Sequence, residues 1–413
     1  MKIRNILKGA VFGVFAISGA AHAADVTLNA LFMAQAAYSE DDIRNMTADF
    51  KAANPGVDVN VELVPYEALH DKIVLSQSAN GYDVVLYDVI WPAEFAQYKL
   101  LEDVTDRIDD KTRKAVLSGA WTTVEYDGKY YGMPWIADTK FLFYNKDMLK
   151  KAGFDHPPAT WEELESQAKV IKDKGIVDYP LVWSWSQSEA AICDYTTILS
   201  GMGGKFLDAD GKPAFNTGGG LKALQYMVGT INDGVTNPNS REYAEEDVRR
   251  VFSSGQAAFA LNWGYMYNLA NDPAESQVAG NVGIVPAPGE AGVSKASAVN
   301  GSMGLGIPSK STHKEEAWKY IQFLTSQKVQ NKYAKLSLPV WEASYSNPDV
   351  IKGQEPFVNA AKTSFAVMAP RPTMASYQEA SAVLQEALQN AMLGTTTPKD
   401  ALDNAANNIA DLQ

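Results

Sequence analysis

The sequence contains a single cysteine, Cys193, in 413 residues, so no disulfide bond can form within the chain. Histidine is also scarce, and none of the four histidines has the spacing of an HEXXH or Cys/His zinc site. No GXSXG motif is present, Gly211-Lys212 is followed by Pro213, and residues 301–306 lack the GXGXXG spacing. We therefore expect no metal, no cofactor and no catalytic residue.

Positive charge is also in short supply. The chain has 36 Lys and Arg against 49 Asp and Glu, a formal net charge of −13, and no run rich in Lys or Arg. Because a protein that binds nucleic acid needs a concentrated basic surface to neutralise phosphates, a nucleic-acid partner is not expected. With 46% hydrophobic and 21% charged residues, the composition is that of a folded globular protein, and the length predicts two or three compact units.

The first 23 residues have the composition of a secretory signal peptide. Three basic residues and no acidic ones precede an almost wholly apolar stretch at 10–21, and Ala-His-Ala at 21–23 matches a cleavage site. A membrane anchor is the alternative, but this stretch is shorter than the ~20 residues that span a bilayer. We expect cleavage near Ala23/Ala24 and a periplasmic product with 33 basic and 49 acidic side chains, a net charge of −16.

Apolar periodicity in the first part of the mature chain alternates between strand and helix patterns. Strands are predicted at 26–32, 57–63 and 84–86, with helices between them. This βαβ order is typical of an α/β fold with a parallel sheet, in which ligands bind just beyond the carboxyl ends of the strands. The segments at those ends are residues 35–38, Tyr66 and residues 88–91.

Turn and helix signals continue through the rest of the chain. Asp127-Gly128, between two short strand-like segments, indicates a β-hairpin with a type I′ turn. Further helices are predicted at 161–172, 221–231, 316–335 and 377–391. Thr160 is placed to cap the first of these helices, and Gly394 to end the last.

The strongest indication of function is the placement of tryptophan. Several of the nine Trp lie in loops that also contain Pro or Gly and polar residues: Trp91, Trp135, Trp183, Trp185 and Trp263. An aromatic ring packs against the C–H face of a sugar while nearby Asp, Asn or Arg side chains bind its hydroxyl groups, so these loops are candidates for a carbohydrate site. The alternative for each Trp is packing at the edge of the core.

Six short motifs occur in an order that is typical of one protein family. Residues 81–92 read GYDVVLYDVIWP, residues 128–134 read GKYYGMP and residues 144–149 read YNKDML; they are followed by TWEEL at 160–164, NWGY at 262–265 and APRP at 369–372. Together they resemble the family 1 extracellular solute-binding proteins of ABC sugar importers, in particular the trehalose/maltose-binding branch. The second and third motifs are the most specific, and the resemblance covers essentially the whole mature chain.

This resemblance implies a two-lobed α/β fold, the periplasmic-binding-protein fold of class II, with a ligand cleft between lobes joined by a three-crossing hinge. Lobe one would comprise residues 24–136 and 287–345, and lobe two residues 137–286 and 346–413. The implied partners are a small carbohydrate ligand and ABC permease subunits in the inner membrane, which work with a separate ATPase. We expect a monomer.

The resemblance also implies a set of ligand contacts. The positions that match those of similar proteins are Asp88, Asp138, Trp263, Tyr265, Gly301, Ser302 and Arg371. Asp88 and Asp138 would accept hydrogen bonds from sugar hydroxyls, whereas Trp263 would stack on a pyranose ring and Arg371 would donate to sugar oxygens. The alternatives are a helix cap for Asp88, a hinge contact for Asp138 and a salt bridge for Arg371. Further candidates, from the loop and strand-end arguments, are Gln35, Tyr38, Tyr66, Trp183 and Trp185.

One departure from the family pattern concerns the size of the ligand. Met303 follows Ser302 at a position where disaccharide-binding relatives often carry a second Trp. An oligosaccharide is therefore one prediction among several, beside a monosaccharide, a polyol, or a glycoside whose anionic group Arg371 would pair. The leading interpretation is a receptor, not an enzyme, that closes on a carbohydrate and delivers it to a permease. The alternatives are a secreted carbohydrate-active enzyme and a sugar receptor for chemotaxis or sensing.

Overall fold

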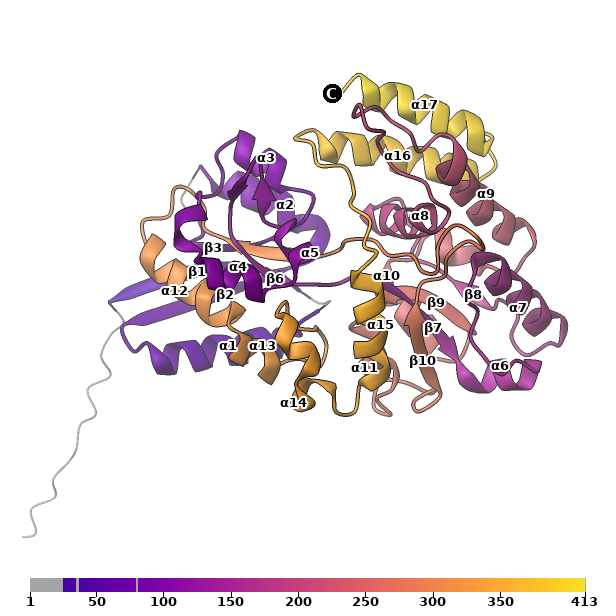
Figure 1. Cartoon of the computed structure of the whole chain (residues 1–413), viewed down its shortest axis with the longest axis horizontal. Coiled ribbons are helices and arrows are strands. Elements are labelled where there is room, and N and C mark those ends of the chain that lie inside the picture. Colours follow the sequence, from indigo (N-terminus) through magenta and orange to yellow (C-terminus); the bar gives the residue numbers. More distant parts are fainter. Residues whose placement is uncertain (1–24, 35–36, 79–80, 413) are drawn as a thin grey trace, which may run out of the picture.

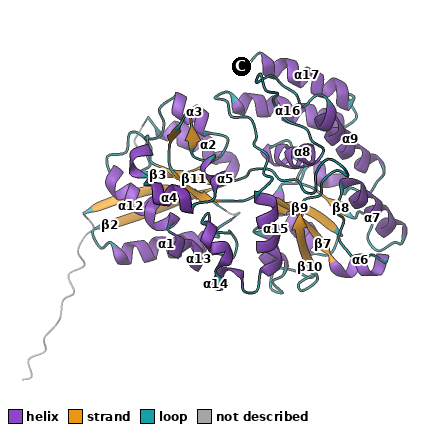
Figure 2. Ribbon diagram, in the orientation of Figure 1, coloured by secondary structure: helices purple, strands orange, loops and turns teal. Residues whose placement is uncertain are grey.

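The computed structural model describes residues 25–34, 37–78 and 81–412, which form two α/β halves that lie side by side (Figure 1). Strands lie at the centre of each half, and helices surround them (Figure 2). The predicted signal peptide and its cleavage site lie outside the described residues. Within the described ranges, no helix combines the length and the apolar character that a membrane crossing requires.

A five-stranded sheet forms the first half, with the strand order β2-β1-β3-β11-β6. Its strands are β1 (Val26–Met33), β2 (Val57–Val64), β3 (Val84–Asp88), β6 (Met133–Ile136) and β11 (Met303–Gly306). β1 is parallel to β2 and β3, as the βαβ pattern predicts, whereas β11 is antiparallel to β3 and β6. The register places Met303 beside both Asp88 and Ile136, so the ends of three strands meet at one edge of the sheet.

Helices pack against this first sheet. α1 (Glu40–Ala53) begins at Ser39, whose side chain accepts a hydrogen bond from the Asp42 amide, and it packs beside α12 (Lys314–Thr325). The rings of Phe50 in α1 and Tyr320 in α12 lie 4.8 Å apart in the core. The other elements of this half are α2 (Tyr66–Ser76), α3 (Pro92–Gln97), α4 (Asp110–Ala115), α5 (Ser118–Trp121), the hairpin β4 (Glu125–Tyr126) and β5 (Lys129–Tyr130), and α13 (Gln327–Lys332).

The second half contains a four-stranded sheet with the order β10-β7-β9-β8. Its strands are β7 (Lys140–Asn145), β8 (Leu181–Val182), β9 (Phe259–Trp263) and β10 (Val282–Pro286). The central pair is antiparallel, and its register sets Lys140 directly opposite Trp263. The helices are α6 (Lys146–Ala152), α7 (Trp161–Asp173), α8 (Glu189–Gly201), α9 (Gly218–Asn232), α10 (Glu245–Ser253), α11 (Met266–Ala270), α14 (Pro348–Ile351), α15 (Glu355–Phe365), α16 (Tyr377–Met392) and α17 (Pro398–Ala410).

The predicted local elements are present, with one exception. Asp127 and Gly128 both have positive φ, 51° and 72°, as a type I′ hairpin turn requires. The prediction of one helix over 316–335 is wrong, because Ser326 has an extended backbone, with ψ 142°, and separates α12 from α13. The Ser326 side chain then accepts a hydrogen bond from the Val329 amide, so this residue caps a new helix instead of continuing the old one.

The chain passes between the two halves after β6, between β10 and β11, and between α13 and α15. Residues 287–299, which the prediction assigns to lobe one, form their bridges with second-half segments: Gly289 pairs with Thr160, and the Glu290 amide donates to the Gly201 carbonyl oxygen. The return to the first half therefore comes at the loop around Asn300. The edge of the first sheet, this loop and the end of β9 consequently meet in one place.

Candidate ligand-binding site

A cavity of about 440 Å³ lies between the two halves and is bordered by side chains from both. This volume is in the range of pockets that hold small organic ligands. Seven of the twelve predicted site residues line it: Tyr66, Asp88, Asp138, Trp263, Tyr265, Gly301 and Arg371. The structure thus brings together residues from six separate segments of the sequence.

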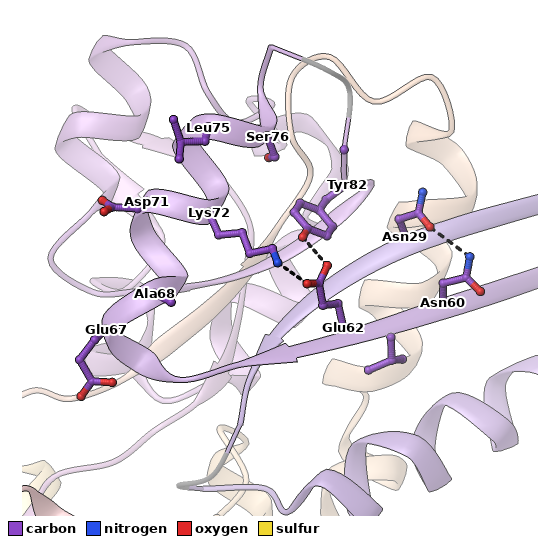
Figure 3. Close-up of a pocket in the computed structure, with 12 residues that line it drawn as sticks. Asn29, Asn60, Glu62, Glu67, Ala68, Asp71, Lys72, Leu75, Ser76 and Tyr82 are labelled. Carbon is purple, nitrogen blue, oxygen red and sulfur yellow. Dashed lines mark hydrogen bonds and ion pairs between the residues drawn. The ribbon is translucent and has the colours of Figure 1, made fainter.

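A second hollow, of about 970 Å³, lies on the first half alone, beside β1, β2 and α2 (Figure 3). Its polar side chains bind one another: Glu62 accepts from Lys72 and from the Tyr82 hydroxyl, and the Asn60 amide donates to Asn29. All the described residues that border it belong to the first half. The cavity between the halves is therefore the better candidate, because only there do both halves contribute to a ligand's surroundings.

Arg371 is the central charged residue of the cavity. Its side chain is 1% exposed, and it lies in the loop between α15 and α16. One terminal nitrogen donates to Glu189 at 2.7 Å, and the other donates to Asp88 at 2.9 Å. Because Asp88 ends β3 and Glu189 begins α8, the guanidinium joins carboxylates from both halves. The salt bridge that was considered as an alternative role for Arg371 is thus present.

The two carboxylates of this network have further hydrogen bonds. Asp88 accepts from the Tyr66 hydroxyl at 2.8 Å, and Glu189 accepts from Tyr377 and Ser381 of α16, both at 2.5 Å. Burial opposes the charge of Arg371, but the attraction of Asp88 raises the pKa of its guanidinium above the ordinary value. The network is therefore a hydrogen-bonded cluster of one arginine and two acidic side chains in the wall of the cavity.

Asp138, which lies between β6 and β7 in the first crossing segment, is different because it has no cationic partner. Its Oδ1 accepts from the backbone amides of Thr139, at 2.8 Å, and Gly264, at 3.3 Å. Burial raises the pKa of the carboxyl to about 7, against these two hydrogen bonds, which lower it. Asp138 is therefore a buried acid whose ionisation is balanced near neutral pH and whose side chain borders the cavity.

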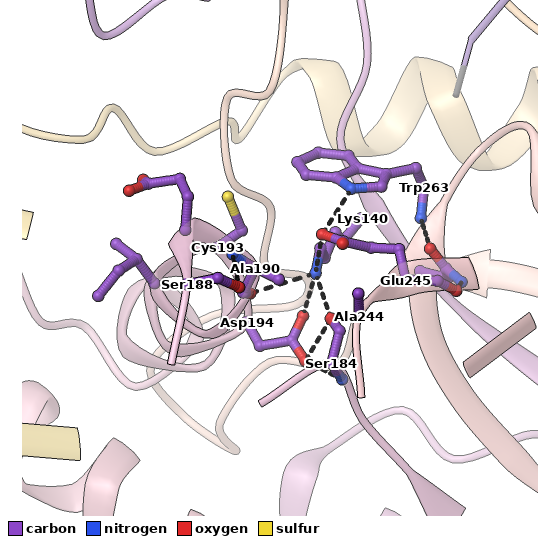
Figure 4. A network of polar contacts seen from close by, with 12 residues as sticks. Lys140, Ser184, Ser188, Ala190, Cys193, Asp194, Ala244, Glu245 and Trp263 are labelled. Carbon is purple, nitrogen blue, oxygen red and sulfur yellow. Dashed lines mark hydrogen bonds and ion pairs between the residues drawn. The ribbon is translucent and has the colours of Figure 1, made fainter. Parts of the chain in front are cut away.

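Trp263 is held in place by a network of buried polar contacts (Figure 4). Its indole N–H donates to Glu245 at 3.1 Å, and the same carboxylate lies 3.4 Å from the ammonium of Lys140. The Lys140 nitrogen is 5.2 Å from the centre of the Trp263 ring, within the range of a cation–π contact. The indole orientation is thus fixed by a carboxylate at its N–H and by a cation near its face.

Lys140 is itself completely buried and is paired with Asp194 of α8. The ammonium lies 2.5 Å from the Asp194 carboxylate and donates to the Ser184 hydroxyl at 2.7 Å. The charge of Asp194 raises the pKa of Lys140 above its ordinary value even though burial works against it. Burial raises the pKa of Asp194, and the charge of Lys140 opposes this shift; the pair forms the wall behind Trp263.

Gly301 is placed where the second half's Trp263 packs against the loop. A Cβ atom at this position would lie 2.2 Å from the Trp263 ring, so the ring and the loop are in van der Waals contact only because residue 301 is a glycine. Gly301 is therefore part of the cavity wall because its backbone packs against Trp263, and it has no side chain that could contact a ligand.

We therefore expect Gly301→Ala to displace the Trp263 ring and to weaken binding of the ligand at least tenfold, with a destabilisation of about 1–3 kcal/mol. Calorimetric titration and urea unfolding measure the two effects. Gly229→Ala is the matched control, because this helical glycine of α9 has open space around it, and there alanine should be neutral or slightly stabilising. Unchanged affinity in Gly301→Ala would contradict the role assigned to this contact.

Four predicted site residues are described but do not line the cavity. Trp183 and Trp185 are 1% and 0% exposed, their rings stack at 5.1 Å, and both belong to the core of the second half. They directly follow the buried strand β8, and their side chains lie in the core. This position does not support the prediction that they contact the ligand. The Tyr38 and Trp135 rings lie 4.8 Å apart in the core of the first half, and Ser302, next to Gly301, is completely buried. Gln35 lies outside the described residues.

Several cavity residues were not predicted. Glu189 and Glu245 each begin a helix, and an acidic residue in a first helical turn is too common to mark a site. Lys140 lies behind Trp263 and does not border the cavity, but it had a detectable signal: a lysine that is buried at the start of the apolar strand KFLFY needs an acidic partner. Cys193 also borders the cavity; it is buried, as predicted, and burial raises the pKa of its thiol. No metal-holding group of His, Cys, Asp or Glu exists in the described part of the chain.

Comparison with known proteins gives a consistent result. The family model "Bacterial extracellular solute-binding protein" matches residues 33–331. A probable ABC transporter-binding protein of Deinococcus radiodurans is 29% identical, with 97% of this chain and 96% of the relative covered. A putative binding protein of Brucella abortus is 28% identical, with 98% of each chain covered.

Solved structures agree with the sequence relatives. The maltose-bound MalE3 of T. maritima is 34% identical, with a TM-score of 0.87 and coverage of 94% of this chain and 100% of that chain. A solute-binding protein of Thermotoga lettingae bound with α-D-tagatose is 29% identical, with a TM-score of 0.84 over 93% of this chain and 99% of that chain. The predicted two-lobed fold is confirmed by these matches. They are transport proteins rather than enzymes, and this chain belongs to the family of bacterial extracellular solute-binding proteins.

Proposed function

We propose that this chain is the substrate-binding component of an ABC importer, which captures a small carbohydrate or polyol between its lobes and delivers it to permease subunits in the inner membrane. A separate ATPase would drive the transport. The observation that carries the proposal is the cavity itself, where carboxylates and aromatic rings from both halves surround about 440 Å³. Such a site recognises a ligand with hydroxyl groups along its edge and C–H groups on its faces.

The ligands of similar proteins support a carbohydrate. The T. maritima protein is bound to maltose and the T. lettingae protein to tagatose. A solute-binding protein of Agrobacterium radiobacter in complex with ribitol is 26% identical, with a TM-score of 0.84 over 94% of this chain and 99% of that chain. A disaccharide, a ketose and a polyol share adjacent hydroxyl groups, and we propose that this shared chemistry defines the substrate class of this chain.

Within the cavity we propose three roles. Asp138 would accept hydrogen bonds from two sugar hydroxyls, Trp263 would stack against the ring or carbon chain, and the Arg371 network would form the polar wall that joins the halves. Tyr66, Tyr265 and Gly301 would complete the enclosure. A ligand that contacts both halves at once would favour the closed arrangement over an open one, because only the closed state makes both sets of contacts.

Our proposal for the lobes follows the prediction with one change. Lobe one would comprise residues 24–136 with the return segment up to 345, and lobe two residues 137–286 and 346–413. Residues 287–299 would move with lobe two, because their bridges join second-half segments. We further propose export to the periplasm with cleavage near Ala23/Ala24, and a monomeric state, which light scattering of the mature chain would test.

The experiment is a thermal-shift screen of residues 24–413, unfolded and refolded to remove any co-purified ligand, against sugars and polyols. A ligand at 100 times its dissociation constant adds about 2.7 kcal/mol of stability, which raises the midpoint by several degrees. Calorimetry should confirm a 1:1 complex, and chromatography of the mixture should show the sugar unchanged. Absence of any shift across the panel would contradict the proposed function, and a released product would favour the enzyme alternative.

A further inference from the structure

The cations around the cavity are all bound to carboxylates in the described part of the chain. Arg371 uses one terminal nitrogen for Glu189 and the other for Asp88 and the Asn300 carbonyl oxygen. Its remaining donor, Nε, has no partner but is inaccessible to solvent. An anionic ligand in the cavity would therefore have to break an existing ion pair before it reached the guanidinium.

Two further basic side chains of this region are also bound to carboxylates. His70, which borders the cavity, places its Nε2 2.8 Å from Glu94. Lys140 lies behind Trp263, is fully buried and is paired with Asp194 at 2.5 Å. Among the described residues of this region, no basic side chain is thus left without a carboxylate partner to receive a carboxylate or a phosphate from a ligand.

Carboxylates, in contrast, are in excess. Six acidic side chains border the cavity: Glu67, Asp88, Asp138, Glu189, Glu245 and Glu246. Glu246 pairs with Arg249 at 3.0 Å, and Arg371 is shared between two of the others. Lys140 is shared between Asp194 and Glu245, and Asp138 receives hydrogen bonds only from backbone amides. The surroundings of the cavity are consequently net negative.

We propose that the cavity selects its carbohydrate by charge: it accepts solutes that are uncharged or carry an amino group, and it rejects those that carry a carboxylate, phosphate or sulfate. This inference rests on the proposed function and narrows its substrate class. An ammonium group would lie favourably beside Asp138, whose carboxyl is nine-tenths buried and, among the described residues, faces no cation. This proposal contradicts the alternative from the sequence, in which Arg371 binds the anionic group of a glycoside.

The test is calorimetry of the refolded mature chain with matched compounds. The sets are glucose, glucosamine and glucuronate; glucitol, 1-amino-1-deoxyglucitol and gluconate; maltose and maltobionate; and ribitol and ribitol 5-phosphate. In any set that binds, we expect the anionic member to be about a hundredfold weaker than the neutral one, because its charge would lie beside the buried carboxylates Asp88 and Asp138. An anionic member that binds as tightly as its neutral counterpart would overturn the inference while leaving the proposed function intact. Absence of binding in every set would contradict the proposed function and, with it, the inference.

A substitution at Glu189 tests whether the network of Arg371, Asp88 and Glu189 causes the charge selectivity. Glu189→Gln keeps an oxygen that accepts from Tyr377 and Arg371, places an NH2 group opposite the Ser381 hydroxyl, and removes one of the charges that Arg371 neutralises. The ratio of neutral to anionic affinity should then fall at least tenfold. Glu386→Gln, an exposed position in the middle of α16, is the matched control and should leave the ratio unchanged. A ratio that is the same in Glu189→Gln and in the native protein would overturn the assignment of selectivity to this network.

Discussion

Replacement of Arg371 by methionine should destabilise the protein by about 3–5 kcal/mol and abolish measurable ligand binding. The substitution leaves Asp88 and Glu189 buried without the cation that both of them face. Removal of one partner from a buried ion pair is costly because the desolvated charge that remains has no compensation. Urea unfolding of the ligand-free protein measures the first effect, and calorimetry with the sugar found by screening measures the second.

A combined variant separates these two effects. Asp88→Asn and Glu189→Gln, introduced together with Arg371→Met, remove all three charges and should restore most of the lost stability, because no unpaired charge remains. Ligand affinity should stay low, since the polar wall of the cavity is altered. Arg250→Met is the control: this arginine is 62% exposed and pairs with Asp247 at the surface, so its loss should cost less than 1 kcal/mol. An Arg371→Met protein as stable as the control would show that the network contributes nothing to the fold.

The sequence predicted the elements that its local pattern determines. The strands at 26–32, 57–63 and 84–86 correspond to β1, β2 and β3, and the turn at Asp127-Gly128 has the predicted positive φ values. These features depend on side-chain alternation and on backbone freedom, which are readable over a few residues. The prediction of a continuous helix over 316–335 is wrong because Ser326 caps a new helix. Serine occurs both at helix N-caps and within helices, so the residue type alone does not show where one helix ends and the next begins.

The site was less predictable for a related reason. Loop tryptophans are equally suited to a ligand and to a core, and only the tertiary arrangement decides: Trp263 borders the cavity, whereas Trp183 and Trp185 stack inside the second half. The two acidic residues that form ion pairs with Arg371 are Asp88 and Glu189, which are far apart in the sequence. They come together because β11 pairs antiparallel with β3 and because the crossing segments hold the two halves side by side. No local sequence pattern predicts these long-range contacts.

Asp138→Asn should make the ligand-free protein more stable at alkaline pH while it weakens ligand binding. The pKa of Asp138 is about 7 in the folded chain against an ordinary value of 3.8, and burial is the main cause. Between these values the folded protein holds a proton that the unfolded chain has released, so stability falls as pH rises from about 4 to about 7. Above pH 7 the accumulated loss approaches about 4 kcal/mol, and asparagine removes it because it has no charge to desolvate.

Unfolding of both proteins at pH 4, 6 and 8 measures this difference. The stability of Asp138→Asn relative to the native chain should increase between pH 4 and pH 8, since other titrating groups affect both proteins alike. Asp106→Asn, at an exposed position, is the control and should show no such trend. Parallel stability curves for the Asp138→Asn and native proteins would contradict the view that this carboxyl is destabilising in its ionised form.

Ligand binding should have the opposite pH dependence. A carboxylate accepts hydrogen bonds from two hydroxyl groups, whereas the protonated acid must donate one of its own, so native affinity should rise as pH increases through about 7. In Asp138→Asn the affinity should be about 10- to 100-fold lower at pH 8 and independent of pH across this range. A native protein whose affinity is constant from pH 6 to pH 8 would remove Asp138 from the ligand contacts. If both results hold, the buried carboxylate of Asp138 has two opposite effects. It destabilises the ligand-free protein because its charge has no cationic partner, and it accepts the hydrogen bonds of the sugar hydroxyl groups when the ligand is bound.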